Sequence, residues 1–270
     1  MRVRPRPDLA VLSVRGDDAR VWLNGQITND VRTTKPGDAV HALVLNAKGR
    51  ILADATVVDR GERGLAAIIP RSEHDALRTH LEKYVIMEDV ELVLEEALDV
   101  AELHGGAASV GEAFAAPWLG EGVSIWMGEL AALAGIDRVP DAEAELARVR
   151  EGRPAFGVDF GPTTYPQEAG LESAISFQKG CYLGQEVVCM LENRGQLSRI
   201  LTKLATDQRV AIGAKVTGAD GAELGAVTSA VATPDGGGLA LAYVKRAALG
   251  EGLALTLGGV PARTLDPARG

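Results

Sequence analysis

The residues that could do chemistry gather in one short stretch of the chain, Lys179 to Glu186, with the sequence KGCYLGQE. Apolar residues at helical spacing follow from Gly184 to Asn193, with Gly195 where a left-handed cap would end a helix. Cys181 therefore lies just before a predicted helix N-terminus, where the helix dipole favours an anion, and Lys179 adds a positive charge. Both features favour a thiolate, so we predict that Cys181 is a reactive thiol.

The remaining residues of this stretch allow more than one interpretation. Gly180 and Gly184 are expected to let the backbone turn tightly or approach a ligand closely. The competing interpretation is that Cys181 is a small buried apolar residue and that the glycines only form a turn. Cys189 lies inside the helical run among apolar residues, and we predict that it belongs to the core.

The elements upstream that must position this stretch have the pattern of an α+β layer. A helix is expected to start with Asp17 as its N-cap and to end near Gln26, Thr28 and Asn29, and a second helix is expected from Ser72 to Tyr84. Strands are predicted at residues 8–14, 41–46, 50–59, 64–69, 89–94, 98–103 and 123–127, with a hairpin turn at 46–49. Strands around a helix on one side indicate a ferredoxin-like arrangement.

The rest of the chain is expected to contain two connecting segments, one helix and a small β-domain. Residues 105–117 are predicted to be a linker, and residues 157–169 an extended loop that leads towards Cys181. Asp141 is expected to cap a helix at 142–150. After a boundary near residue 197, short β-rich runs separated by glycine-rich turns predict a small barrel or sandwich, with strands at 200–205, 214–217, 223–231, 239–244 and 253–257.

Composition and cysteine usage exclude several classes of function. The net charge of −9 argues against broad nonspecific nucleic-acid binding, which needs a basic surface. No apolar run approaches the ~20 residues of a membrane span, and no secretory signal is apparent. Two cysteines cannot supply the four thiolates of an ordinary iron–sulfur site, and the four histidines lack metal-ligand spacing, so no stable metal is predicted. We expect a reducing compartment, the cytoplasm.

Four segments in the same order carry a family resemblance: residues 21–31, 45–58, 81–92 and 166–188. They resemble the YgfZ family, folate-binding proteins related to the glycine cleavage T protein, an aminomethyltransferase, and to a mitochondrial iron–sulfur assembly factor. The resemblance implies an α+β ring of three subdomains around a central hole that binds a reduced folate such as tetrahydrofolate. The subdomains would be residues 1–40 with 118–197, residues 41–117, and a C-terminal β-barrel at 198–270.

The resemblance also implies a set of site residues. The family's motif centres on a cysteine and a lysine, which map onto Cys181 and Lys179. Five further residues complete the match to this motif: Gly180, Tyr182, Gly184, Gln185 and Glu186. A folate cavity is expected between the first two subdomains, lined by residues 24–29 including Asn29, by residues 45–54 including Asp54, and by the Cys181 loop. Arg194 is expected either to contact the glutamate tail of a folate or only to interact favourably with the dipole of its helix. Tyr182 is expected either to stack on a pterin or only to fill the core.

Three differences separate this chain from the aminomethyltransferase. The glutamate that holds the pterin there is replaced by Arg150, with Glu151 one residue late, and of two paired aspartates only Asp54 is kept, which could also be an ordinary strand-face charge. The transferase also lacks the cysteine at position 181. We therefore expect an accessory, folate-binding factor for iron–sulfur cluster assembly or repair, with clients that include a tRNA-modifying enzyme. The alternatives are a folate-dependent one-carbon transferase and a module that only senses folate.

Overall fold

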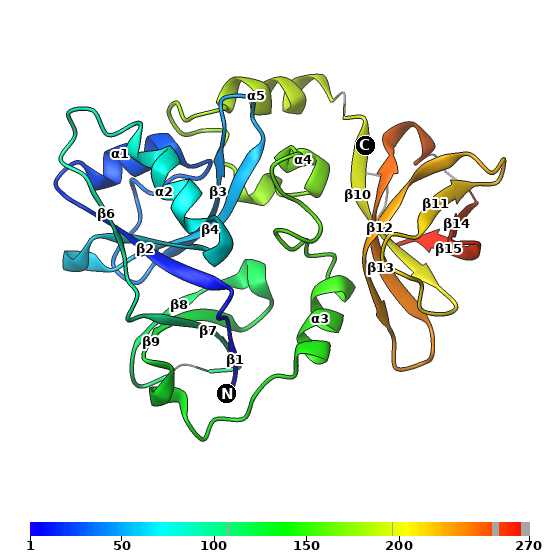
Figure 1. Cartoon of the computed structure of the whole chain (residues 1–270), viewed down its shortest axis with the longest axis horizontal. Coiled ribbons are helices and arrows are strands. Elements are labelled where there is room, and N and C mark those ends of the chain that lie inside the picture. The colour runs from blue at the N-terminus through cyan, green and yellow to red at the C-terminus, as the bar shows by residue number, and fades with distance from the viewer. Residues whose placement is uncertain (107, 196, 250–253, 266–270) are drawn as a thin grey trace. The chain divides into compact units, whose positions relative to one another are not determined.

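A computed structural model describes residues 1–106, 108–195, 197–249 and 254–265 (Figure 1). The chain forms two units, each with dense internal contacts. Unit 1 comprises Met1–Pro140 and Glu172–Cys189, and unit 2 comprises Asp141–Leu171 and Met190–Gly270. The division into three subdomains stays a prediction. None of the helices in the described ranges has the length and apolar content needed to cross a lipid bilayer.

Unit 1 contains two antiparallel sheets. The five-stranded sheet has the order β3-β4-β5-β2-β6, formed by β2 (Leu9–Arg15), β3 (Ala39–Leu45), β4 (Ile51–Asp59), β5 (Leu65–Pro70) and β6 (Glu91–Leu94). The four-stranded sheet has the order β1-β7-β9-β8, formed by β1 (Arg2–Pro5), β7 (Asp99–His104), β8 (Glu112–Ala115) and β9 (Val123–Gly128). The 41–46/50–59 hairpin prediction corresponds to β3 and β4.

Both faces of the five-stranded sheet are covered within unit 1. On β4, Ala53, Ala55 and Val57 point to one face, because side chains alternate along a strand, and pack in a core with helices α1 (Ala19–Gln26) and α2 (His74–Glu82). Val58 faces the other way, into a core shared with β7, β8 and β9. The sheet therefore has α1 and α2 on one side and the second sheet on the other.

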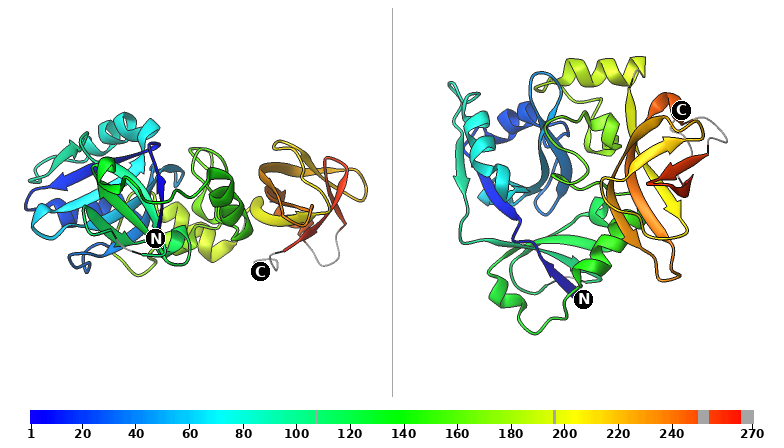
Figure 2. Two further views of the ribbon diagram at one scale, coloured as in Figure 1. Left: turned by 90° about the horizontal axis from the view of Figure 1, so that it is seen from below. Right: turned by 45° about the vertical axis from the view of Figure 1, so that its right-hand side comes forward.

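Unit 2 contains helices and a closed barrel. Helix α3 spans Asp141–Arg150, α4 spans Pro166–Ala169, and α5 (Gln185–Arg194) runs from unit 1 into unit 2. The barrel order is β10-β13-β12-β11-β14-β15, closed by pairing of β10 with β15; the strands are β10 (Arg199–Thr206), β11 (Lys215–Gly218), β12 (Glu223–Ala232), β13 (Gly238–Lys245), β14 (Leu255–Leu257) and β15 (Val260–Thr264) (Figure 2). Buried and half-buried residues alternate along β10, so one face of that strand points into the barrel core.

Three helix starts differ from the sequence prediction. Asp18, not Asp17, precedes α1, and its carboxylate accepts a hydrogen bond from the backbone of Asp89 instead of capping the helix. Ser72 lies in a 3₁₀ turn, Arg71–Glu73, that comes before α2. Helix α3 already includes Asp141. In the first two cases a competing partner or a tighter turn takes the capping position, which local sequence does not reveal.

Two segments predicted to lack regular structure contain some. The predicted linker 105–117 holds β8, which pairs with β9 at the edge of the second sheet. The predicted loop 157–169 ends in α4, whose first turn begins with a proline. The barrel also gains β15, which the sequence prediction omitted; residue 253, at the start of the predicted strand 253–257, lies outside the described residues.

Candidate functional site around Cys181

Lys179 closes the C-terminal end of helix α1. The last carbonyl groups of a helix have no partner within it, and they carry the negative end of the helix dipole. The Lys179 ammonium donates to three oxygens there, the carbonyls of Asn24 at 2.5 Å, Ile27 at 2.7 Å and Asn29 at 2.7 Å. Lys179 is only 6% exposed, and burial lowers its pKa from 10.5 to about 8. The lysine of the motif is thus fully engaged in holding the backbone of residues 24–29.

Two exposed residues separate the buried Lys179 from the buried Tyr182. Tyr182 is 7% exposed, and the centre of its ring lies 5.3 Å from the Lys179 ammonium nitrogen. Burial raises the pKa of Tyr182, and its hydroxyl has no hydrogen-bond partner among the described residues. Between these two anchors Gly180 and Cys181 are both exposed. The loop therefore presents the Cys181 thiol outwards from a buried base.

Cys181 stands further from helix α5 than the sequence suggested. The helix begins at Gln185, four residues later, whereas the helix dipole acts mainly within the first turn. The ammonium of Lys179 is directed into the α1 carbonyls and not left free for a neighbouring thiolate. The accessibility of Cys181, rather than the helix terminus, is what distinguishes this cysteine from Cys189, which is half-buried in α5.

The two glycines of the motif have different roles. Gly184 adopts φ = +82°, and a side chain there would bring its Cβ to 2.6 Å from the carbonyl oxygen of Asn46 and 3.2 Å from the Cα of Gly49. Gly184 thus packs directly on the β3–β4 turn, where only glycine fits. A Cβ on Gly180 would meet nothing within 4 Å, and its φ is not positive. Gly184 therefore approaches protein backbone closely, whereas the predicted close approach of Gly180 to a ligand stays a prediction.

The remaining motif residues lie on α5. Gln185 is its half-buried first residue and Glu186 is exposed. The helix ends at Arg194, and Gly195 follows with φ = +58°, donating its N–H to the Leu191 carbonyl at 2.9 Å, as expected of a left-handed cap. The side chain of Arg194 lies outside the described part of the structure, so its proposed contact with a folate tail stays a prediction.

Residues 27–29 run along strand β3 and connect the Cys181 loop to the hairpin. The backbone N–H of Thr28 donates to the Leu43 carbonyl at 3.0 Å, and the N–H of Leu43 donates back to the Thr28 hydroxyl at 2.8 Å. The side-chain amide of Asn29 donates to the His41 carbonyl at 2.8 Å. Asn29 is thus held on β3 from one side and, through its own carbonyl, by Lys179 from the other.

Asp54 forms a pair that sequence reasoning missed. Its carboxylate lies 2.6 Å from Nε2 of His41, whose ring stacks on Trp118 with centroids 5.6 Å apart and planes at 12°. The His41 side chain is 12% exposed and that of Asp54 is 33% exposed. The predicted hairpin contained the signal for this pair. Leu43 lies opposite Asp54 in the antiparallel pairing, and His41, two residues before Leu43 on β3, has its side chain on the same face.

These contacts link Lys179, Asn29 and, through His41, Asp54 into one framework of unit 1, made of the α1 terminus, β3 and β4. Cys181 joins this framework through the chain, two residues after Lys179. Two acceptors in it have no partner among the described residues: the second carboxylate oxygen of Asp54, and the buried side-chain oxygen of Gln26. No group of three or more potential metal ligands occurs in the part of the chain that the structure describes. The framework therefore holds two acceptors without a donor and carries one exposed cysteine.

Comparison with known proteins places the chain in a family. Residues 8–109 match the model of the GCVT N-terminal domain. The tRNA-modifying protein YgfZ of Klebsiella pneumoniae is 30% identical over 228 residues, which cover 73% of this chain and 69% of that protein. This chain belongs to the YgfZ family. Its Enterobacter member, also called tRNA-modifying protein YgfZ, is 29% identical over 231 residues, covering 73% of this chain and 70% of the relative.

The fold extends beyond the YgfZ family. The glycine cleavage system aminomethyltransferase T of Bartonella henselae superimposes with a TM-score of 0.82 over 97% of this chain and 84% of its own, at 20% identity. The predicted α+β class, with a fold like that of the glycine cleavage T protein and a C-terminal β-barrel, is confirmed. The resemblance to YgfZ proteins inferred from four segments is confirmed as well.

Proposed function

We propose that this protein is a folate-binding accessory factor that supports iron–sulfur cluster assembly or repair in the cytoplasm, with Cys181 as its working thiol. Its partners would be iron–sulfur enzymes or assembly proteins, including a client that modifies tRNA. The names of the YgfZ relatives, which are called tRNA-modifying proteins, support the last point. In this role Lys179 is a positioning residue, because it fixes the loop that carries the thiol.

The observation that carries the proposal is the exposure of Cys181 between two buried anchors. Thiols that exchange clusters or sulfur with a partner must be accessible, and a loop fixed on both sides presents the sulfur without a further loss of conformational entropy on binding. A cysteine kept only for packing would be buried like its neighbour Tyr182.

The polar groups of the framework suit a reduced folate. A pterin ring carries several N–H donors, and the free carboxylate oxygen of Asp54 and the orphaned side-chain oxygen of Gln26 are acceptors that such donors would satisfy. Asn29 would orient the ligand only through the backbone it holds, because both ends of its amide are already bonded. When bound, the folate would supply a carrier for one-carbon groups. Tyr182 would contribute by supporting Lys179, since its ring is buried.

A complementation experiment tests the thiol. In a bacterium that lacks its own family member, we expect the Cys181→Ala variant to be produced as a folded protein and to leave the activity of iron–sulfur enzymes unrestored. The matched control is Cys189→Ala, which removes the half-buried cysteine of α5 and should restore activity. Full rescue by Cys181→Ala would refute the role of the thiol. Titration of the purified protein with tetrahydrofolate, with Asp54→Asn as the comparison, tests the folate part separately.

One-carbon transfer is a second candidate, favoured by the pairing of His41 with Asp54. An imidazole and a carboxylate in hydrogen-bond contact can hold or pass a proton, which transfer to a folate nitrogen requires. Against it, Glu151, the carboxylate nearest to the family's pterin-binding position, is paired with Arg153 at 2.7 Å. Absence of transfer from an aminomethylated carrier protein, while tetrahydrofolate still binds, would remove this candidate.

A further inference from the structure

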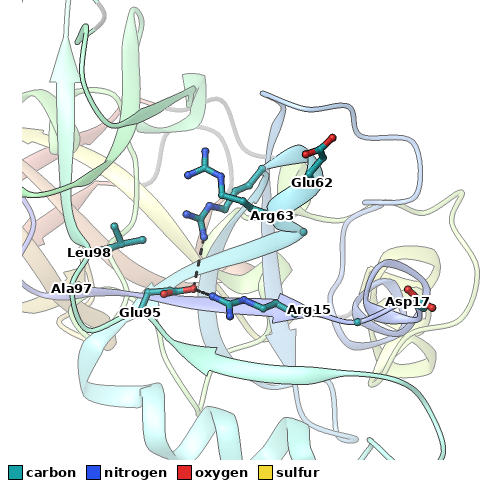
Figure 3. A pocket seen from close by; sticks show the side chains of 11 residues that line it. Arg15, Asp17, Glu62, Arg63, Glu95, Ala97 and Leu98 are labelled. Atoms are coloured by element: carbon teal, nitrogen blue, oxygen red, sulfur yellow. Dashed lines mark hydrogen bonds and ion pairs between the residues drawn. The ribbon is translucent and has the colours of Figure 1, made fainter.

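A second candidate site lies in unit 1, on elements other than those of the Cys181 framework. It is a half-open cavity of about 630 Å³ between the end of β2, the β4–β5 turn and the β6–β7 turn (Figure 3). Its size falls in the range of roughly 300–1,000 Å³ that small-molecule sites have. The side chains relevant to binding are those of Arg15, Arg60, Arg63, Glu95, Ala97 and Leu98.

The floor of the cavity is a buried polar network built on Arg60. Its guanidinium donates to both carboxylate oxygens of Glu112, at 2.7 and 3.1 Å, and to the hydroxyl of the fully buried Ser13 at 3.2 Å. The Ser13 hydroxyl in turn donates to Glu95 at 2.6 Å, and this bond and nearby arginines hold the pKa of Glu95 below its usual value. Arg60 thus joins the two carboxylates of the site, Glu112 directly and Glu95 through Ser13.

Two more arginines converge on the same carboxylates from the solvent side. Arg15 pairs with Glu95, and Arg63 pairs with Glu112 at 2.9 Å. Their side chains are 47% and 62% exposed, and each uses one nitrogen in these pairs, although a guanidinium has five N–H donors. The other donors have no partner among the described residues.

The three arginines of the site, Arg15, Arg60 and Arg63, pair with two glutamates, Glu95 and Glu112. The cavity is also lined by the carboxylates of Asp17 and Glu62, so its lining carries no excess of positive charge. An anion would be held by the open donors of Arg15 and Arg63 rather than by a net positive charge. Paired guanidinium groups with open donors fit the oxygens of a phosphate group, since each can form two parallel hydrogen bonds to it.

The geometry points to a binding site for a small phosphorylated compound that carries hydroxyl groups, a sugar phosphate. Arg15 and Arg63 hold the phosphate, and the second carboxylate oxygen of Glu95, which has no partner in the described part of the chain, accepts a hydrogen bond from a hydroxyl. Ala97 and Leu98 form the apolar wall for the carbon skeleton. The site stands whether or not the protein binds folate, because none of its residues belongs to the Cys181 framework.

Calorimetric titration of the full chain tests the assignment, with ribose 5-phosphate, inorganic phosphate and ribose as three separate probes. We expect ribose 5-phosphate to bind more tightly than phosphate, and ribose alone to bind least. The double variant Arg15→Gln/Arg63→Gln should weaken binding of ribose 5-phosphate by about tenfold or more, the effect of losing at least one charge-assisted hydrogen bond. Glu95→Gln should weaken the binding of ribose 5-phosphate, because it removes the carboxylate that accepts the hydroxyl. It should not weaken the binding of phosphate, because it also removes a negative charge.

Arg78→Gln is the matched control, because Arg78 is another half-exposed arginine of unit 1 that pairs with a single carboxylate, Glu82. It should leave all three affinities unchanged. Tryptophan fluorescence, with circular dichroism, confirms that the variants are folded, and the single variants Arg15→Gln and Arg63→Gln replace the double variant if it is not. The assignment is overturned if ribose 5-phosphate does not bind at millimolar concentration, if it binds no better than phosphate, or if folded arginine variants bind it like the wild type.

Discussion

Two buried cations hold unit 1 together in different ways. The Lys179 ammonium is surrounded by three backbone carbonyls, whereas the Arg60 guanidinium is bonded to the carboxylate of Glu112 and the hydroxyl of Ser13. Both side chains are almost fully buried. Carbonyl dipoles compensate a buried charge less than a carboxylate does, and a lysine can lose its proton whereas an arginine does not. The loop of Cys181 therefore depends on a cation that is less well compensated and can titrate.

Replacement of Lys179 should have the largest effect. Lys179→Met leaves three carbonyl oxygens at the end of α1 without a donor, and we expect the free energy of unfolding of unit 1 to fall by about 3 kcal/mol at pH 7. All three tryptophans of the chain lie in unit 1, so urea unfolding followed by tryptophan fluorescence reports on this unit. Lys35→Met, at an exposed lysine, is the control. A change below about 1 kcal/mol would mean that water replaces the ammonium.

Replacement of Arg60 should cost less. In Arg60→Met, Glu112 keeps its pair with Arg63, and Glu95 keeps its bonds to Arg15 and Ser13. We therefore expect a loss of about 1–2 kcal/mol in the same fluorescence experiment, because the carboxylates stay partly compensated. A larger loss than that of Lys179→Met would reverse the comparison and identify the arginine network as the stronger support of unit 1.

The pH dependence should distinguish the two cations by a smaller effect. The pKa of Lys179 is about 8 in the folded protein and 10.5 without the fold, so between these values the unfolded chain binds more protons. The free energy of unfolding of the wild type, relative to Lys179→Met, should therefore rise with pH across this window. The difference between the wild type and Arg60→Met should stay constant, because arginine remains charged. Urea unfolding at about pH 7.5 and about pH 10 measures both differences in the free energy of unfolding. If the difference between the wild type and Lys179→Met stays constant or falls with pH, the assignment is contradicted.

The sequence was informative where a pattern is local. Alternation and turn residues predicted the β3–β4 hairpin, and helical spacing followed by glycine predicted α5 with its cap at Gly195. The other barrel strands were found for the same reason, whereas β15 was missed because it has Pro261 as its second residue, which argues against a strand. Strand β8 was missed because its stability comes from pairing with β9 and not from its own composition.

The site was predictable as a segment but not as a geometry. The motif identified Cys181 and Lys179, yet Lys179 was expected to act on the thiol, and it binds carbonyls that lie 150 to 155 residues earlier in the chain. Gly180 and Gly184 looked equivalent in sequence, and the positive φ of Gly184 and its close approach to Asn46 distinguish them. The pairing of His41 with Asp54 likewise depends on strand register, which the separate residues do not show.

The way the barrel closes has a consequence for its synthesis. Strand β10 pairs with β13 and β15, and β14 pairs with β11 and β15, so β15 is the piece that completes the circle. Until Val260–Thr264 has left the ribosome, β10 and β14 each expose an unpaired backbone edge on which another nascent chain could add a strand. A chain cut before residue 260 would keep both edges open, and self-association is the expected result.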